Sequence, residues 1–436
     1  MRSRLAVTTG ALLVLSILGM GTAGAETPEG QLQLDLARCV DLAIEANTSV
    51  LKAQYSLDRS TNSVISSASN LLPSVGWGAG YGKAKQSSHD SLGTEFVTTT
   101  KGYNATLAVN ENLSVPLALG LYQSLSTRVA VEENVRAARQ QVAYTAKQKY
   151  LEVLRAQRLL VVNQEALDLS KRRLEKAQAM LEVGSGVKSD VLRAQVEVGT
   201  NELNLISARN ALRLAETDLK AFLRVADSRE VQLEDVLEPG ATAYTLGGSL
   251  SDAMELRPDV RAGAATVRTD RAAVWQARGA WLPALSYSWS RDYASQDFPD
   301  RVGDVWDDSD WRWNLGISFS IADIVGTHLS VSNAKIQLKS STEDLSQTRR
   351  DAALEVKQAF YKVEEAEQRV KVSTETVSLA EEELRLAEER YRLGGGTMLE
   401  QIDAQLALSQ ARISHVQALY DYLLSQAELA RATGRD

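Results

Sequence analysis

The residues with the clearest chemical potential are carboxylates that follow glycine-rich segments. Glu400 and Asp403 are three residues apart, which places both on one face of a helix. Asp190 follows an earlier glycine-containing turn. If several copies bring such carboxylates around one axis, the charges titrate as a set and attract cations. A simpler reading stays open, because acidic residues near a helix N-terminus are favoured by the helix dipole.

Other chemistry is poorly supported. The three histidines, His89, His328 and His415, have no second ligand at metal-binding spacing, so we expect no metal, no cofactor and no enzyme activity. A net charge of −8 without basic blocks argues against nucleic-acid binding. The single cysteine, Cys39, is typical of a small buried apolar residue.

The N-terminus has the three parts of a secretory signal. Arg2 and Arg4 precede an apolar stretch over residues 5–20, and Ala23-Gly24-Ala25 is a small-residue cleavage motif. We therefore predict a cleaved signal peptide at residues 1–25. An uncleaved anchor is the alternative, although the apolar stretch is shorter than the roughly 20 residues of a spanning helix.

The rest of the chain is a duplication. Leu72-Pro73 recurs as Leu282-Pro283, and Gly184 recurs as Gly394, both at a separation of 210 residues. Ala194-Gln195 and Ala404-Gln405 keep the same separation. We predict one structural repeat over residues 26–240 and a second over 241–436.

Each repeat is expected to hold two strands, a very long helix, a turn and a shorter helix. In the first repeat these are strands at about 74–82 and 102–116, a helix at about 118–182, a turn at 183–189 and a helix at about 187–224. In the second they are strands at about 284–292 and 310–321, a helix at about 328–392, a turn at 393–397 and a helix at about 398–433. Polar loops are expected at about 83–101 and 293–310. Because a helix rises about 1.5 Å per residue, the long helices would reach about 100 Å.

The long helices repeat every seven residues, which favours left-handed coiled coils. Large residues keep this spacing in both repeats, with small or polar residues three positions later. The large residues are Val153, Leu160, Leu167, Leu174 and Leu181, then Val363, Val370, Val377, Leu384 and Tyr391. The seam alone is equally typical of a coiled-coil rod, such as an adhesive surface stalk.

The strand-like segments argue against a plain rod, because four times an aromatic or apolar face alternates with a small or polar one. In the first, Val75, Trp77, Ala79 and Tyr81 alternate with glycines. This is the pattern of membrane-barrel strands, although one such segment alone equally fits a soluble sheet. Bacterial barrels start at about eight strands, so four strands must be shared between chains. The strand count does not choose between two, three or four copies.

Taken together, these motifs resemble the TolC-type outer-membrane efflux protein family over essentially the whole mature chain. The resemblance lies in the two Leu-Pro motifs, in Val183-Gly184-Ser185-Gly186 followed by Asp190, and in Tyr391 through Gly396 followed by Glu400 and Asp403. It also includes Arg257-Pro258-Asp259. A periplasmic adaptor is a weaker alternative, because that protein needs compact soluble β domains around a single helical hairpin.

The resemblance implies a mainly α fold with a small β part. Duplicated helix–strand–strand–helix repeats would form a long α-helical coiled-coil barrel and a four-strand share of an oligomeric transmembrane β-barrel. It implies a homotrimer with twelve barrel strands in outer-membrane lipid of a Gram-negative bacterium and a helical tunnel through the periplasm. A periplasmic adaptor and an inner-membrane transporter would be its partners in tripartite efflux or type I secretion, and the duct would conduct passively. The sequence does not identify the exported substrate.

By the same resemblance, particular residues acquire roles. The constriction would contain Asp190, Tyr391, Glu400 and Asp403. The adaptor-docking turns would contain Val183, Gly184, Ser185, Gly186, Leu393, Gly394 and Gly395. Gly396 departs from one well-known member of the family, which has a gate arginine at this position, so the closing contacts must differ here.

Overall fold

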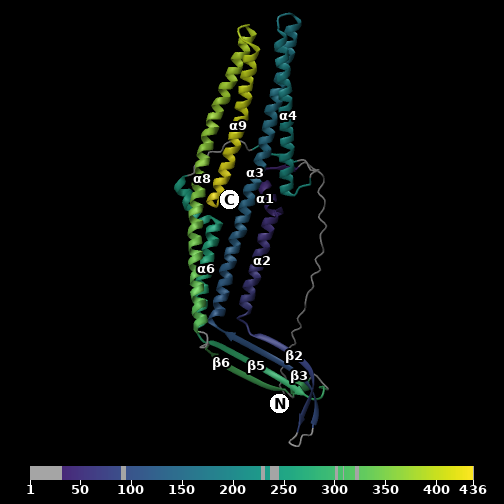
Figure 1. Ribbon diagram of the computed structural model, residues 1–436, viewed down its shortest axis with the longest axis vertical. Coiled ribbons are helices and arrows are strands. Elements are labelled where there is room, and N and C mark those ends of the chain that lie inside the picture. The colour runs from purple at the N-terminus through teal and green to yellow at the C-terminus, as the bar shows by residue number, and fades with distance from the viewer. Residues whose placement is uncertain are drawn as a thin grey trace, which may run out of the picture.

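The protein is described by a computed structural model that covers residues 32–89, 95–226, 231–235, 245–299, 303–307, 309–319 and 324–435. The predicted signal peptide lies outside these residues. Figure 1 shows a tall stack of helices joined at one end to a sheet. The mainly helical, duplicated architecture predicted from the sequence is confirmed.

Four helices form a wall at the end away from the sheet. They are α3 (Val115–Glu182), α4 (Lys188–Leu223), α8 (Ile324–Arg392) and α9 (Met398–Thr433). The order across the wall is α8, α9, α3, α4 (Figure 1). α3 has 68 residues and α8 has 69, so each is about 100 Å long.

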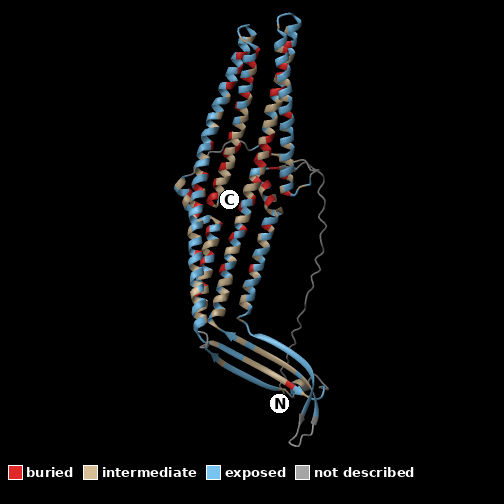
Figure 2. Cartoon of the chain, in the orientation of Figure 1, coloured by how far each residue is buried: buried red, intermediate tan, exposed pale blue. Residues whose placement is uncertain are grey.

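Nearer the sheet, the long helices exchange partners. α2 (Thr48–Ser69) packs on α3, and α6 (Pro258–Gly279) packs on both α3 and α8. Two short helices, α1 (Leu36–Ala46) and α5 (Leu246–Leu256), lie around the middle of the column. Both small and large residues are buried along the seams: Ala177 is 3% exposed, Val153 is 1% exposed and Leu167 is 4% exposed. Buried residues are spread along the helical column, whereas the sheet is mostly exposed (Figure 2).

The sheet has four antiparallel strands in the order β2 (Ser74–His89), β3 (Glu95–Leu113), β5 (Ala284–Ser295) and β6 (Asp310–Ser318). Trp77 and Trp313 are 72% and 58% exposed. β2 and β6 are the two edges and pair with no further strand in the described part of the chain. One copy therefore presents an open sheet with exposed aromatic residues.

Some expected boundaries were wrong. Residues 83–89 and 95–101 continue the β2–β3 hairpin, where we expected a polar loop, because the alternation of outward and inward side chains persists after the apolar residues end. β3 stops at Leu113 rather than 116 because Pro116 lies in the first turn of α3, where its missing N–H costs nothing. β6 ends at Ser318, and part of its expected extension lies outside the described residues. A short helix, α7 (Asp304–Asp307), lies in the second expected loop.

A small parallel sheet was missed. β1 (Leu32–Leu34) pairs with β4 (Val231–Leu233) around the middle of the column. The hydroxyl of Tyr150 donates to the carbonyl oxygens of Leu34, at 3.1 Å, and Glu234, at 2.7 Å. Tyr150 and Cys39 are both 0% exposed in the surrounding core. Among the described helices, none combines the length and apolarity needed to cross a membrane.

Candidate gate and docking site at the helical tip

The tip consists of two turns with the same backbone geometry. Gly184 and Gly394 have φ angles of +76° and +78°, a conformation that side chains disfavour. The amide of Gly186 donates to the carbonyl of Met180 at 2.8 Å, and the amide of Gly396 donates to that of Arg390 at 3.1 Å. These bonds satisfy the last carbonyls of α3 and α8 in the same way. The duplication therefore extends to individual hydrogen bonds.

Gly396 is constrained by its surroundings. A Cβ atom added there would lie 3.0 Å from the backbone nitrogen of Tyr391 and 3.2 Å from the carbonyl carbon of Arg390. Any side chain at 396 therefore requires the turn to shift.

Tyr391 lies where the two hairpins meet. Its hydroxyl contacts the sulfur of Met180 at 3.6 Å, and the ammonium of Lys176 lies 5.3 Å from its ring centre. Burial and the nearby charge of Asp190 raise the pKa of the tyrosine hydroxyl above its usual value. The structure thus brings Tyr391 and Asp190 close together.

The other two predicted acids lie on the first two turns of α9. Glu400 and Asp403 are both exposed. The amide of Glu400 donates to the hydroxyl of Thr397 at 3.2 Å, so Thr397 caps α9. Thr397-x-x-Glu400 is a capping-box sequence, and the helix-end interpretation of Glu400 therefore has direct support. A role at a constriction needs further copies of the chain around the same axis.

The turns also expose apolar side chains. Val183 is 77% exposed and Leu393 is 79% exposed, at equivalent points of the two hairpins. The hydroxyl of Ser185 is engaged with the carbonyl of Met180 at 3.2 Å. Gly395 and the two positive-φ glycines leave backbone accessible beside these side chains. Such an end is suited to contact with another protein.

A buried ionic group behind the tip was missed by sequence reasoning. Arg173 of α3 is 6% exposed at its side chain and contacts Glu197 of α4 at 3.1 Å. It also donates to the side-chain oxygen of Gln405 of α9 at 3.3 Å and lies 3.9 Å from Glu388 of α8. Burial raises the pKa of Glu197, and the charge of Arg173 partly opposes this. We call Arg173, Glu197, Gln405 and Glu388 the clasp.

The clasp belongs to a polar seam between α3 and α9. Along it, Arg412 contacts Glu165 at 2.8 Å, and Arg155 donates to Gln417 at 2.7 Å. Apolar contacts also cross this seam, because Ala177 and Val191 of the first hairpin share a core cluster with Met398 of the second.

Within the second hairpin, the helices combine an apolar cluster that includes Leu384 and Leu408 with an ion pair between Lys362 and Glu428. Polar and apolar contacts therefore both join the two hairpins.

No group of three or more histidine, cysteine, aspartate or glutamate side chains suited to a metal ion occurs within the described ranges. The open sheet, the helical wall and the duplicated tip together define a membrane-channel subunit. Residues 39–223 and 249–435 match the family described as outer membrane efflux protein, and the chain belongs to that family. This membership places it in the outer membrane, with the helices extending into the periplasm.

Individual relatives are more distant. The chain is 26% identical to outer membrane efflux protein BepC of Brucella suis over 70% of this chain and 66% of BepC. It is 22% identical to outer membrane protein TolC of Escherichia coli over 89% of this chain and 80% of TolC. A membrane protein from Pseudomonas aeruginosa has the same fold, with a TM-score of 0.81, 20% identity and coverage of 92% of this chain and 93% of that one.

Proposed function

We propose that this chain forms the passive exit duct of a tripartite efflux or type I secretion system, as a homotrimer. The observation that carries the proposal is an open four-stranded sheet attached to a helical wall about 100 Å long. In lipid, the unpaired edges of β2 and β6 must be closed by other strands. Three copies supply twelve strands, an even number within the range of bacterial barrels.

The helical wall has matching apolar edges that support such a ring. On α4, Leu192, Val196 and Leu203 are between 53% and 70% exposed, and Leu192 and Val196 line a groove shared with α3 and α9. On α8, exposed Leu379 and Leu386 are seven residues apart and lie at a similar distance from the tip. Because the two edges differ, each copy would place its α4 edge against the α8 edge of the next, a head-to-tail arrangement that closes into a ring.

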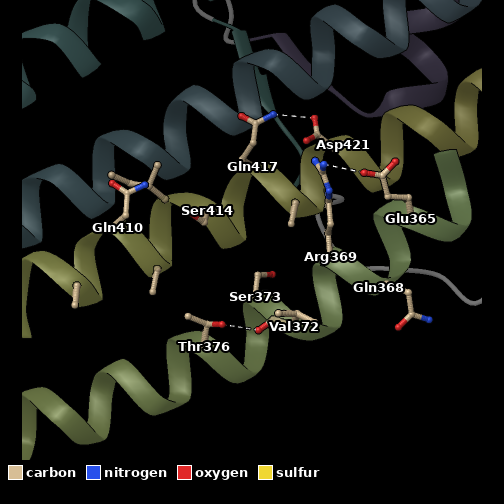
Figure 3. Close-up of a pocket in the computed structure, with 14 residues that line it drawn as sticks. Glu365, Gln368, Arg369, Val372, Ser373, Thr376, Gln410, Ser414, Gln417 and Asp421 are labelled. Atoms are coloured by element: carbon tan, nitrogen blue, oxygen red, sulfur yellow. Dashed lines mark hydrogen bonds and ion pairs between the residues drawn. The ribbon is translucent and has the colours of Figure 1, made fainter.

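A groove next to the α8 edge supports the same arrangement. Figure 3 shows residues of α8 and α9 around it, and the groove encloses about 1080 Å³. Arg369 and Glu365 form an ion pair at 2.8 Å on one side, whereas Val372 contributes an apolar wall. Small residues, Ala411 and Ala418, form part of the lining. We infer that the α4 edge of the next copy occupies this groove.

The gate would open by separation of the hairpins along the polar α3–α9 seam. Contacts of Arg173 with Gln405 and Glu388, and of Tyr391 with Met180, join the hairpins near the tip. Threefold repetition would bring Asp190, Glu400 and Asp403 around the axis as a cation-attracting ring. With no side chain at 396, the clasp would take the restraining role of the absent arginine.

The exposed turns would dock a periplasmic adaptor. Val183 and Leu393 supply apolar contact, and the shared backbone geometry offers an adaptor with repeated helical hairpins equivalent sites. The adaptor would connect the duct to an inner-membrane transporter, which supplies the energy.

Single-channel conductance of the detergent-purified protein in planar bilayers tests the duct and its gate. We expect a small, cation-selective conductance, and we expect Glu400→Gln with Asp403→Asn to reduce that selectivity. Glu364→Gln with Glu367→Gln removes two exposed charges far from the tip and serves as the matched control. Unselective channels unaffected by the tip changes would reject the gate residues and keep the duct. Absence of channels would reject the duct.

Cysteine cross-linking tests the ring. Leu203→Cys combined with Leu379→Cys is expected to give covalent trimers in membranes, whereas each single substitution is not. Cross-linking that stops at dimers would argue against a closed threefold ring.

A further inference from the structure

Charge is distributed unevenly between the two faces of the β2–β3 hairpin. On the face that carries Trp77 and Tyr81, the register continues as Tyr81 opposite Tyr103, then Lys83 opposite Lys101, then Lys85 opposite Thr99. The other face, from Gly76 opposite Ala108 to Gln86 opposite Thr98, is neutral and consists of small or uncharged residues. Barrel strands usually place polar residues toward the lumen and apolar ones toward lipid. Here the lysines extend the lipid-side face.

The position of these lysines relative to the membrane follows from the aromatic residues beside them. The rings of Tyr81 and Tyr103 are 4.8 Å apart, and Phe298 lies 5.3 Å from Tyr103. Tyrosines in such positions mark the boundary between hydrocarbon and headgroups. Lys83 and Lys101 come two residues further along their strands, or roughly 7 Å. Their ammonium groups therefore reach the headgroup layer on the hairpin side, which is the outer leaflet.

The positive charges of the cross-strand pair Lys83 and Lys101 are only partly neutralised by carboxylates in the described part of the chain. Like charges directly opposite each other on neighbouring strands destabilise the pair. Lys101 has an ion pair with Asp297 at 3.4 Å, but Asp297 is 90% exposed at its side chain. Within the described part of the chain, Lys83 and Lys85 have no ion pair. An anion bound between the strands would remove this repulsion.

The surface is also accessible. β5 pairs with β3 only from Tyr103 to Leu113, and β6 pairs with β5 over nine residues, so the upper part of the hairpin extends beyond both strands. A groove of about 580 Å³ lies beside Lys83 and Lys101. Its lining also includes Ala294 and Ser295 at the end of β5.

We propose that Lys83, Lys85 and Lys101 form a binding site for the phosphate groups of a phosphorylated glycolipid in the outer leaflet. Point-like ammonium groups are suited to phosphate, and their neighbouring tyrosines contact the acyl region of the same lipid. The inference rests on the outer-membrane placement, with the hairpin at the exterior, and goes beyond conduction. Its consequence is a lipid held against the edge strand β2.

Native mass spectrometry of the full-length protein extracted in mild detergent tests the site. The probes are the phosphorylated glycolipid of the outer leaflet and the same lipid with its phosphates removed. We expect Lys83→Gln/Lys85→Gln/Lys101→Gln to retain roughly tenfold less phosphorylated lipid than wild type, since each basic residue near a membrane surface contributes measurably. The dephosphorylated lipid should bind all variants equally weakly. Replacement of the same three lysines by arginine should preserve binding.

Controls separate lipid binding from other roles. Lys335→Gln/Lys339→Gln/Lys357→Gln removes the same charge from exposed helical positions and should retain lipid as wild type does. Excess inorganic phosphate that displaces the lipid from wild type would support a phosphate-specific site. Equal lipid retention by wild type and the lysine-free hairpin variant would overturn the proposal, and increased self-association of that variant would then assign the lysines to protection of an exposed edge strand. Unchanged conductance of the same variant shows that the duct itself is intact.

Discussion

The two hairpins, α3/α4 and α8/α9, share their backbone and differ in the side chains that join them. Both turns have a glycine in the left-handed conformation and the same hydrogen bonds back to the preceding helix. Arg173, however, corresponds to exposed Glu383 at the duplication spacing, and Glu197 corresponds to Ala407. The buried Arg173–Glu197 ion pair therefore has no equivalent in the second repeat. The shared backbone geometry of the two turns is suited to a common docking surface. The buried ion pair, in contrast, restrains only the α3/α4 hairpin of each copy.

The largest expected difference in local stability is between substitution of Arg173 and substitution of its counterpart, Glu383. Arg173→Met leaves Glu197 buried without a cation, which costs about 3 kcal/mol. We expect amide hydrogen exchange near the start of α4 to become about a hundredfold faster in the full-length protein. Glu383→Met, at the equivalent exposed position, should change exchange less than about twofold.

A double variant distinguishes the ion pair from packing. Arg173→Met with Glu197→Leu removes both charges and should recover most of the lost protection, because an apolar pair can replace a buried ion pair. Equal amide exchange rates for Arg173→Met and Glu383→Met would contradict the proposal that a buried ion pair stabilises only the α3/α4 hairpin.

The two turns test the shared part of the comparison, because equivalent substitutions are expected to destabilise both turns equally. Gly184→Ala and Gly394→Ala each place a side chain in the left-handed region and should each cost about 1–2 kcal/mol of local stability. Gly395→Ala is the control, since an added Cβ there meets only the carbonyl oxygen of Arg390, at 3.8 Å. Hydrogen exchange of the turn amides measures the local stability of the three variants. A large difference between the first two would contradict the shared geometry.

The N-termini of α4 and α9 differ in helix capping, and the expected effect on stability is smaller. Thr397 caps α9, whereas Val187 at the start of α4 makes no side-chain capping bond. Thr397→Ala should therefore destabilise the first turn of α9 by about 1 kcal/mol. Val187→Thr should stabilise the first turn of α4 by roughly half as much. Protection of the first-turn amides is the measurement, and loss of protection in Val187→Thr would show that its exposed valine has a packing role.

The smallest effect is expected at Cys39, whose counterpart at the 210-residue spacing is Ser249. Both side chains are buried, and burial raises the pKa of the Cys39 thiol to about 12. At pH 8 the thiol is protonated, so a maleimide should label it only after denaturation. Cys39→Ala should cost about 1 kcal/mol or less because it removes only one sulfur atom from the core. Leu203→Cys provides an exposed thiol as the positive control for labelling.

The sequence predicted the features that leave a local or periodic signature. Gly184 and Gly394 were recognisable because a positive φ favours glycine, and the sheet was recognisable from alternation around Trp77 and Trp313. The membrane-channel fold and family followed from these patterns. The roles assigned to Asp190, Tyr391, Glu400 and Asp403 stay predictions, because a constriction depends on neighbouring copies.

The clasp could not be predicted in the same way. Its members come from four helices, and Arg173 and Gln405 are 232 residues apart, so no local pattern connects them. The three-residue strands β1 and β4 are too short for alternation to identify. The upper β2–β3 hairpin was taken for a loop because Lys83 and Lys85 replace the apolar residues on the outer face.

The open edges of the sheet determine how the duct is made. A single chain that entered lipid alone would place the backbone groups of β2 and β6 where no water can satisfy them. Encounter between copies must therefore come before or together with insertion. The rate at which new ducts form is then expected to rise more steeply than the concentration of chains, so synthesis rate, rather than the stability of finished assemblies, would limit the supply.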